Sequence, residues 1–220
     1  MTALRDQIPL GPHRARVAQY LREIAFPAGS VAARIIDERA AERSSDDSMR
    51  PGLLLWSCDA GGGDLGDALP VGAAFELFDR FLMLHEELAD ESAPAIARWG
   101  LGQSLNAGDA LYALAFRSLA HEARSPERRL ETARLVAGAV LDAIEARGAV
   151  ARDAVMTGAA LQAGVVIAGA PGEVVAAFAR AGRLLAAQPS AAVALLRPCV
   201  NKAALADFEE VARYVARRAA

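Results

Sequence analysis

The stretch 69–91 constrains the fold of this chain more than any other. It is mostly apolar, yet it carries carboxylates at Glu76, Asp79, Glu86 and Asp90. Positions three, four and seven apart fall on one face of an α-helix, whereas a strand would distribute them over both faces. The segment is therefore predicted to be a long buried helix with an acidic stripe. Because buried carboxylates need partners or water, the stripe is expected to line a cavity or to face a partner subunit.

The rest of the sequence also favours helices. Hydrophobic residues make up 54% of the 220 residues and aromatic residues only 5%, and a composition rich in alanine and leucine is typical of packed helices. We predict an all-α single domain over 1–220, with about eight to ten helices. Gly61–Gly66 is predicted to be an interhelix turn, because no strand precedes it and no Gly-Lys-Ser/Thr follows. Besides 69–91, the predicted helices are 14–43 (broken near Pro27), one from Pro51, 106–122, 126–146, 151–169, 172–187 and 203–218, with 93–103 as a loop.

Several classes of protein are disfavoured by composition. A net charge of −3 gives no reason to expect nucleic acid, and Cys58 and Cys199 have no metal-binding spacing. The N-terminus is polar, without a signal peptide, and no window reaches the roughly 18 uninterrupted apolar residues of a membrane span. The run 155–170 comes nearest, but Gln162 and three glycines make a buried core helix the expectation. We therefore expect a cytoplasmic protein with no membrane span.

The carboxylates Glu86, Glu87 and Asp90 form an acidic cluster at the end of this stripe. Three segments around the cluster carry a family resemblance. In order and spacing, 49–56 (with Arg50-Pro51), 68–78 and 106–111 (Asn-Ala-Gly-Asp-Ala-Leu) resemble the N-terminal half of the trans-isoprenyl diphosphate synthases, or polyprenyl synthetases. In that family an Arg-Pro pair opens a helix, a DDxxD motif preceded by His follows, and an AGDAL segment comes next. The stretch Glu86–Asp90 stands where DDxxD would stand.

The resemblance implies a fold and a set of site residues. It implies an isoprenoid-synthase-like helical bundle, in which Mg²⁺ would be held weakly by Glu86, Glu87 and Asp90. It further implies that a short prenyl diphosphate is the ligand and that the chain forms a homodimer or a heterodimer with a complete synthase. The remaining implied residues are Arg50 and Arg98 for binding diphosphate, and Phe81 and Leu82 for the pocket that limits chain length.

The chain departs from the family pattern at several positions. The family's GGKRxRP motif reads Ser45–Pro51 here, with Asp47 in place of the lysine and Ser48 in place of an arginine. A later Lys-Thr pair reads Met156-Thr157, and the stretch 189–193, where a second aspartate-rich motif is expected, holds no carboxylate. Within the family resemblance, these differences predict a degenerate and C-terminally shortened member.

Three functional hypotheses follow. The first is a non-elongating prenyl-diphosphate-binding or regulatory subunit in isoprenoid biosynthesis. The second is a terpene-synthase-like enzyme that ionises a short prenyl diphosphate with only the first acidic cluster. The third is an active prenyltransferase whose missing motifs are replaced from other positions.

Two weaker features stay open at this point. His85 precedes the acidic cluster and fits either a base or a hydrogen-bonded core histidine. The stretch 207–210 (Asp-Phe-Glu-Glu) fits either a substitute acidic cluster or the solvated face of an amphipathic helix.

Overall fold

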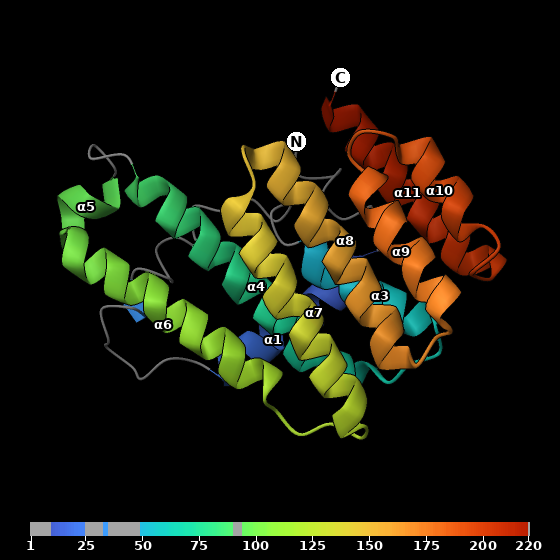
Figure 1. Ribbon diagram of the computed structural model, residues 1–220, viewed down its shortest axis with the longest axis horizontal. Coiled ribbons are helices and arrows are strands. Elements are labelled where there is room, and N and C mark those ends of the chain that lie inside the picture. Colours follow the sequence, from blue (N-terminus) through green and yellow to red (C-terminus); the bar gives the residue numbers. More distant parts are fainter. Residues whose placement is uncertain (1–9, 25–32, 35–48, 90–93, 220) are drawn as a thin grey trace.

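The chain folds into helices throughout the part that the structure describes. The computed structural model describes residues 10–24, 33–34, 49–89 and 94–219, and no strand occurs among them. The predicted all-α class is therefore confirmed (Figure 1). The ten helices in the described residues are α1 (Gly11–Glu23), α3 (Met49–Ala60), α4 (Leu65–Leu88), α5 (Pro94–Trp99), α6 (Leu101–Leu119), α7 (Pro126–Glu145), α8 (Ala149–Ala168), α9 (Gly172–Leu184), α10 (Pro189–Leu196) and α11 (Lys202–Ala219).

Helix α4 is the long buried helix that the acidic stripe predicted. It packs against α3, α6 and, through its polar face, α8. It begins four residues before the predicted start because the side chain of Asp64 caps it, accepting a hydrogen bond from the Gly66 nitrogen at 2.6 Å. Its apolar faces bury Phe75 and Phe78 completely.

The prediction of a loop over 93–103 was wrong. Pro94 opens the short helix α5, and α6 begins at Leu101, five residues before the predicted helix. Gly100, with φ of +76°, makes the bend between them. The Ser104 hydroxyl donates to the Ala95 carbonyl at 3.2 Å, which ties the two helices together.

Most other predicted boundaries agree with the structure to within a few residues. Ser125 caps α7 by accepting from the Arg128 nitrogen. Gly61, Gly62 and Gly63 form the turn between α3 and α4, whereas Gly66 already lies in α4. The predicted helix 14–43 corresponds to α1 at its start, and most of its remainder lies outside the described residues.

Two hydrophobic clusters form the core, and helices α3 and α8 contribute to both. The first joins α3, α4, α6, α7 and α8, and the second joins α9, α10 and α11 to the other face of α3 and α8. Trp56 of α3 anchors the second cluster, with its ring stacked 5.1 Å from Phe208 and 6.0 Å from Phe178 between centroids. The α3–α8 pair is thus the shared wall of the bundle.

Small residues allow α8 to approach its neighbours closely. A Cβ at Gly164 would overlap the Leu54 carbonyl oxygen and the Ser57 hydroxyl of α3, and a Cβ at Gly182 of α9 would lie 2.7 Å from Gly158 of α8. By length and composition α8 could cross a membrane, but 56% of its apolar window is buried in the fold, and core helices satisfy the same criterion. The expected core helix over 155–170 is therefore present.

We predict that Gly164→Ala destabilises the protein by about 1–3 kcal/mol or more, because the added methyl meets backbone atoms of α3 that cannot move aside. The matched control is Gly138→Ala on α7, where a Cβ meets nothing within 4 Å. That change should be neutral or stabilising by up to about 1 kcal/mol, because alanine favours helix. Urea unfolding of both variants checks the prediction, and equal midpoints would contradict it.

Candidate active site: the acidic stripe of α4

The inner part of the acidic stripe is buried and paired with arginines. Glu76 and Asp79 are only 2% and 3% exposed. The Arg80 Nε donates to Glu76 Oε1 at 3.0 Å within α4, and the Arg50 Nη1 lies 2.6 Å from Asp79 Oδ1 across the α3–α4 contact. The stripe therefore faces charged groups of its own chain.

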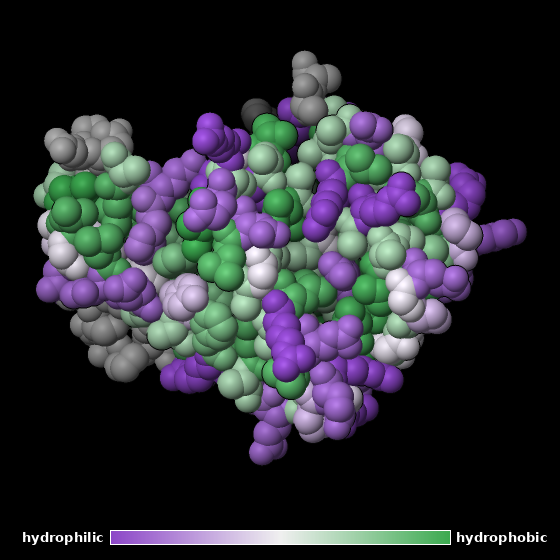
Figure 2. Space-filling view, in the orientation of Figure 1, coloured by the Kyte–Doolittle hydropathy of each residue, from purple (hydrophilic) through white to green (hydrophobic). Residues whose placement is uncertain are grey.

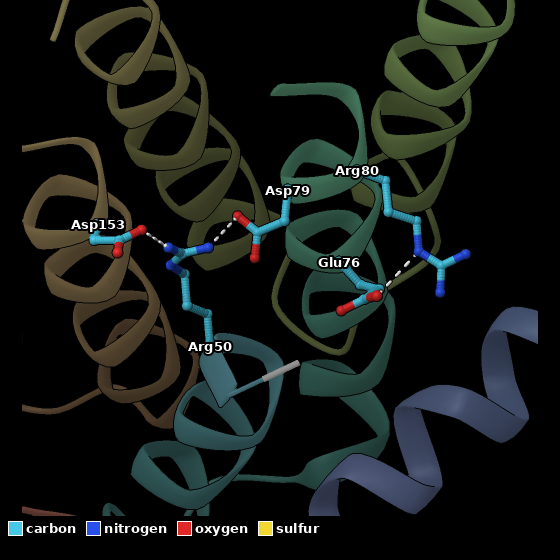
Figure 3. A network of polar contacts seen from close by, with 5 residues as sticks. All are labelled: Arg50, Glu76, Asp79, Arg80 and Asp153. Carbon is cyan, nitrogen blue, oxygen red and sulfur yellow. Dashed lines mark hydrogen bonds and ion pairs between the residues drawn. The ribbon is translucent and has the colours of Figure 1, made fainter. Parts of the chain in front are cut away.

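Arg50 connects three helices (Figure 3). From the second residue of α3 its guanidinium lies between Asp79 of α4 and Asp153 of α8, and forms an ion pair with each. Burial is the largest single influence on Arg50 and alone would lower its pKa, but the attraction of Asp79, and then of Asp153, raises the pKa above its ordinary value. Arg50, predicted to bind diphosphate, is thus held by two carboxylates.

The outer end of the stripe has its own cation. The Arg152 Nη2 of α8 lies 2.7 Å from Glu86 Oε1, and the side chain of Arg152 is mostly buried while that of Glu86 is half exposed. Glu87 Oε1 accepts from the Ala95 nitrogen at 3.5 Å, at the start of α5. Asp90, the third predicted metal ligand, lies outside the described residues.

The described carboxylates do not fit a magnesium site as they stand. Among the described residues no three acidic, histidine or cysteine side chains are grouped to hold a metal ion. Glu86, one of the two predicted ligands that can be assessed, contacts a guanidinium, and a metal ion beside that group would meet a like charge. Carboxylate oxygens are suitable ligands for Mg²⁺, but the ion pair of Glu86 with Arg152 opposes metal binding there.

Arg98 lies on the exposed side of α5 and stacks on an aromatic ring. Its guanidinium carbon is 5.3 Å from the centroid of Trp99, and that of Arg34 is 5.1 Å from the same ring. A cation over a ring face is attracted electrostatically, so the ring holds two guanidinium groups near the end of α4. The role of Arg98 in binding diphosphate stays a prediction.

The predicted chain-length residues lie on another face of α4. Phe81 packs against His85 of the same helix, with centroids 4.5 Å apart, and against Tyr112 of α6 at 5.1 Å. Leu82 is buried in the first hydrophobic cluster. The structure thus places Phe81 toward α6, whereas Glu86 contacts α8, and the pocket role of both residues stays a prediction.

His85 and the C-terminal acidic residues have structural surroundings. The His85 ring packs on Gly108, where a Cβ would overlap it, which explains the glycine in the Ala107-Gly108-Asp109 segment. Its Nε2 is buried with no hydrogen-bond partner among the described residues. On α11, Glu209 pairs with Arg197 at 3.4 Å at the surface, as expected of a solvated face.

The sequence did not identify the groups that pair with the acidic stripe or with Arg50. Arg80 could have been found, because it is four residues from Glu76 on the same helix. Arg152 and Asp153 could not, since they are 66 and 103 residues from their partners Glu86 and Arg50, and only the packing of α8 against α3 and α4 brings them together.

We predict that Arg50→Met costs about 3–5 kcal/mol of stability, because it leaves the carboxylate of Asp79 buried without its cation. Adding Asp79→Leu should recover most of that loss. Arg134→Met, at an exposed position on α7, serves as the control and should change stability by no more than about 0.5 kcal/mol. Guanidinium unfolding of the parent, the two single variants Arg50→Met and Asp79→Leu, and the double variant measures the coupling, and additive single effects would show that the pair is not a unit.

Comparison with known proteins gives both sequence relatives and structural neighbours. No family model matches the chain. A geranylgeranyl diphosphate synthase of Mycobacterium tuberculosis is 40% identical over 89 residues, 38% of this chain and 25% of the relative. A (2E,6E)-farnesyl diphosphate synthase of the same species is 30% identical over 169 residues, 66% of this chain and 47% of the relative. The matched regions span at most about half of these relatives.

The solved structures share the fold over nearly the whole chain. An FPP/GFPP synthase of Zymomonas mobilis superposes with a TM-score of 0.73 at 17% identity, covering 98% of this chain and 100% of the other. A geranyl diphosphate synthase small subunit of Antirrhinum majus gives 0.66 at 15% identity, covering 96% and 93%. The order of the Arg-Pro helix, the acidic helix α4 and the Ala-Gly-Asp helix α6, together with these relatives, places the chain in the polyprenyl synthetase family of isoprenyl diphosphate synthases.

Proposed function

We propose that this chain is a non-elongating member of its family that acts as a prenyl-diphosphate-binding or regulatory subunit. The observation that carries the proposal is the pairing of Arg50 with Asp79 and Asp153. The family resemblance assigns Arg50 to diphosphate, but a diphosphate would have to displace two carboxylates to reach this guanidinium. Arg50 is the one cation of the GGKRxRP motif that the chain retains, and its two ion pairs stabilise the fold.

The sequence departures support the same proposal. Asp47, Ser48 and Met156 stand where the family resemblance expects cations, and 189–193 has no carboxylate for a second metal cluster. A hydrogen bond to a charged group contributes about 1.5–3 kcal/mol, so losing three or four of them lowers affinity on the order of a thousandfold. Loss of a metal cluster also removes stabilisation of the charge that develops on a leaving diphosphate.

The outer face of α6 supports a role in assembly. Its exposed large apolar residues recur at helical spacing and form one partly exposed stripe, of which Tyr112 and Phe116 also contact Phe78 of α4. Neighbouring apolar residues on the exposed face of one helix mark an interaction surface. The residues of this α6 stripe are Leu101, Leu105, Tyr112 and Phe116. The small subunit of A. majus has the same fold and is by name a subunit, which fits this role.

The face of the molecule drawn in Figure 2 carries both hydrophobic and hydrophilic side chains. Figure 2 shows a mainly hydrophobic patch at the α5 end of the molecule and hydrophilic side chains scattered over the face formed by α7, α8 and α9. The apolar surface at the α5 end adjoins the start of α6, where Leu101 is half exposed. We therefore place the subunit contact on α6.

One observation favours the alternative of a terpene-synthase-like enzyme. Arg34 and Arg98 flank Trp99, and Arg152 lies against Glu86, so three guanidinium groups occur near the acidic end of α4. Arginine forms paired hydrogen bonds with phosphate oxygens. These groups could hold one prenyl diphosphate without the motif cations.

The activity prediction is binding without elongation. With geranyl diphosphate, isopentenyl diphosphate and Mg²⁺, product should form at less than about a thousandth of an ordinary enzymatic rate of roughly 1 per second. Geranyl diphosphate alone should bind, and Arg98→Met should weaken binding about tenfold, because it removes a charged contact. The matched control is Arg134→Met on the exposed face of α7.

The outcomes of these activity assays distinguish the three functional hypotheses. Release of diphosphate from geranyl diphosphate alone, abolished by Glu86→Gln, would support the terpene-synthase-like alternative. Condensation at about 1 per second by this chain alone would contradict the proposed non-elongating role.

The assembly prediction concerns the α6 stripe. The chain should form a dimer in light scattering, either alone or after mixing with a complete synthase. Leu101→Glu combined with Leu105→Glu should give a monomer, because two charges would be buried without partners. The control is Leu141→Glu on α7, which is 64% exposed and should leave the mass unchanged. A dimer that survives the α6 changes would place the contact elsewhere.

A further inference from the structure

A polar cavity lies at the end of α4 opposite to the acidic cluster. Its volume is about 470 Å³, and it lies where α3 turns into α4, α7 begins and α8 ends. About 22 residues of helix separate Asp64 at this end from Glu86 at the other, which corresponds to roughly 33 Å. The cavity is thus separate from the site considered above.

Three arginines line this cavity, and within the described part of the chain only Arg124 forms an ion pair with a carboxylate. Arg124 pairs with Asp64 Oδ2 at 2.6 Å on the exposed rim. Arg128 donates to the Ile167 carbonyl at 3.3 Å, and Arg129 Nη2 donates to the Asp67 carbonyl at 2.8 Å. Arg128 and Arg129 therefore contact backbone oxygens, which carry no net charge.

Arg129 is the decisive residue. It is only 9% exposed, and its Nη1 has no hydrogen-bond partner among the described residues. Burial is the main influence on its pKa and lowers it, and the attraction of Asp67 only partly opposes this. Because Asp67 offsets the cost of burial only in part, an anion in the adjoining cavity would lower the cost of keeping Arg129 charged.

The surrounding groups favour an anion over a cation. The first turn of α7, capped by Ser125, adds the positive end of a helix dipole. Asp64 Oδ1 accepts from the Gly66 nitrogen, and Asp67 Oδ1 accepts from the Arg124 nitrogen at 3.2 Å, so these oxygens already have donors. Three guanidinium groups face two carboxylates, which leaves the cavity positive.

A purely structural role explains only part of the arrangement. Arg128 lies across Gly169, where a Cβ would overlap its guanidinium, and it satisfies a carbonyl at the end of α8. Arg129 ties α7 to the first turn of α4. These roles account for Arg128 Nη1 and Arg129 Nη2 and leave the buried Arg129 Nη1 unexplained.

We propose that this cavity binds a phosphate group, either inorganic phosphate or the terminal phosphate of a monoester. Arginine presents paired donors that match phosphate oxygens, and Arg128 and Arg129 reach the cavity from successive positions of α7. Phosphate is small enough for a cavity of this volume, which has room for a short organic group attached to it. The site lies beyond the proposed prenyl-diphosphate region and does not depend on it.

The test is calorimetric titration of the full chain with inorganic phosphate and, separately, with glycerol 3-phosphate, at a constant ionic strength set with chloride. Binding should be lost or weakened at least tenfold in Arg129→Met, and severalfold in Arg128→Met. Because Arg129 is buried, Arg128→Met at the exposed position decides the question if the first variant does not fold. Arg134→Met, also on α7 and outside the cavity, should bind as the parent does.

Two results would overturn the proposal. One is the absence of binding of either compound at 10 mM or so, a concentration well above ordinary ligand affinities. The other is binding that Arg128→Met leaves unchanged, or that Arg152→Met at the far end of α4 abolishes. Tighter binding of glycerol 3-phosphate than of phosphate would assign the cavity to a monoester, and the reverse order would assign it to the free ion.

Discussion

The fold depends on the neutralisation of buried carboxylates on α4 by arginines of the same chain. Glu76 and Asp79 lie in an apolar bundle, where an unpaired charge would be prohibitively costly. Arg50 satisfies Asp79 and reaches Asp153, so one guanidinium fixes the relative positions of α3, α4 and α8. Two of these helices, α3 and α8, are also held together by the close approach at Gly164. Polar pairing and small-residue packing thus specify the same arrangement.

This neutralisation has a consequence for function. The family resemblance assigns Arg50 to a diphosphate and Glu86 to a metal ion that would hold it, and such groups stabilise the charge on a leaving diphosphate. Here Arg50 is engaged by Asp79 and Asp153, and Glu86 is engaged by Arg152. We infer that the charges which would serve a ligand are used to stabilise the bundle, and this inference supports a binding or regulatory role in place of chain elongation. The exposed α6 stripe offers the surface such a role requires.

The sequence predicted the helices well because the apolar spacing and the capping residues of a helix lie within or beside that helix. The spacing of Glu76, Asp79 and Glu86 in the sequence is enough to identify the acidic face of α4. The prediction failed at 93–103, where Pro94 and Gly100 are typical of loops, yet Pro94 opens the six-residue helix α5 and Gly100 separates it from α6. The partners of the stripe could not be predicted, because Arg152 is 66 residues from Glu86 and nothing local records that contact. The expectation that the stripe would face a cavity or a partner overlooked arginines within the chain.

The most direct test of this account is a calorimetric Mg²⁺ titration, with inorganic diphosphate present, of the parent chain and of Arg152→Met. If Arg152 occupies the place of a metal at Glu86, removing its charge should tighten Mg²⁺ binding by about fivefold, equivalent to about 1 kcal/mol for a partly exposed pair. Arg147→Met, an exposed arginine at the start of the same region, is the control and should not change the affinity. Equal Mg²⁺ affinities for the parent and Arg152→Met, or weaker binding in Arg152→Met, would contradict the internal neutralisation of the acidic cluster.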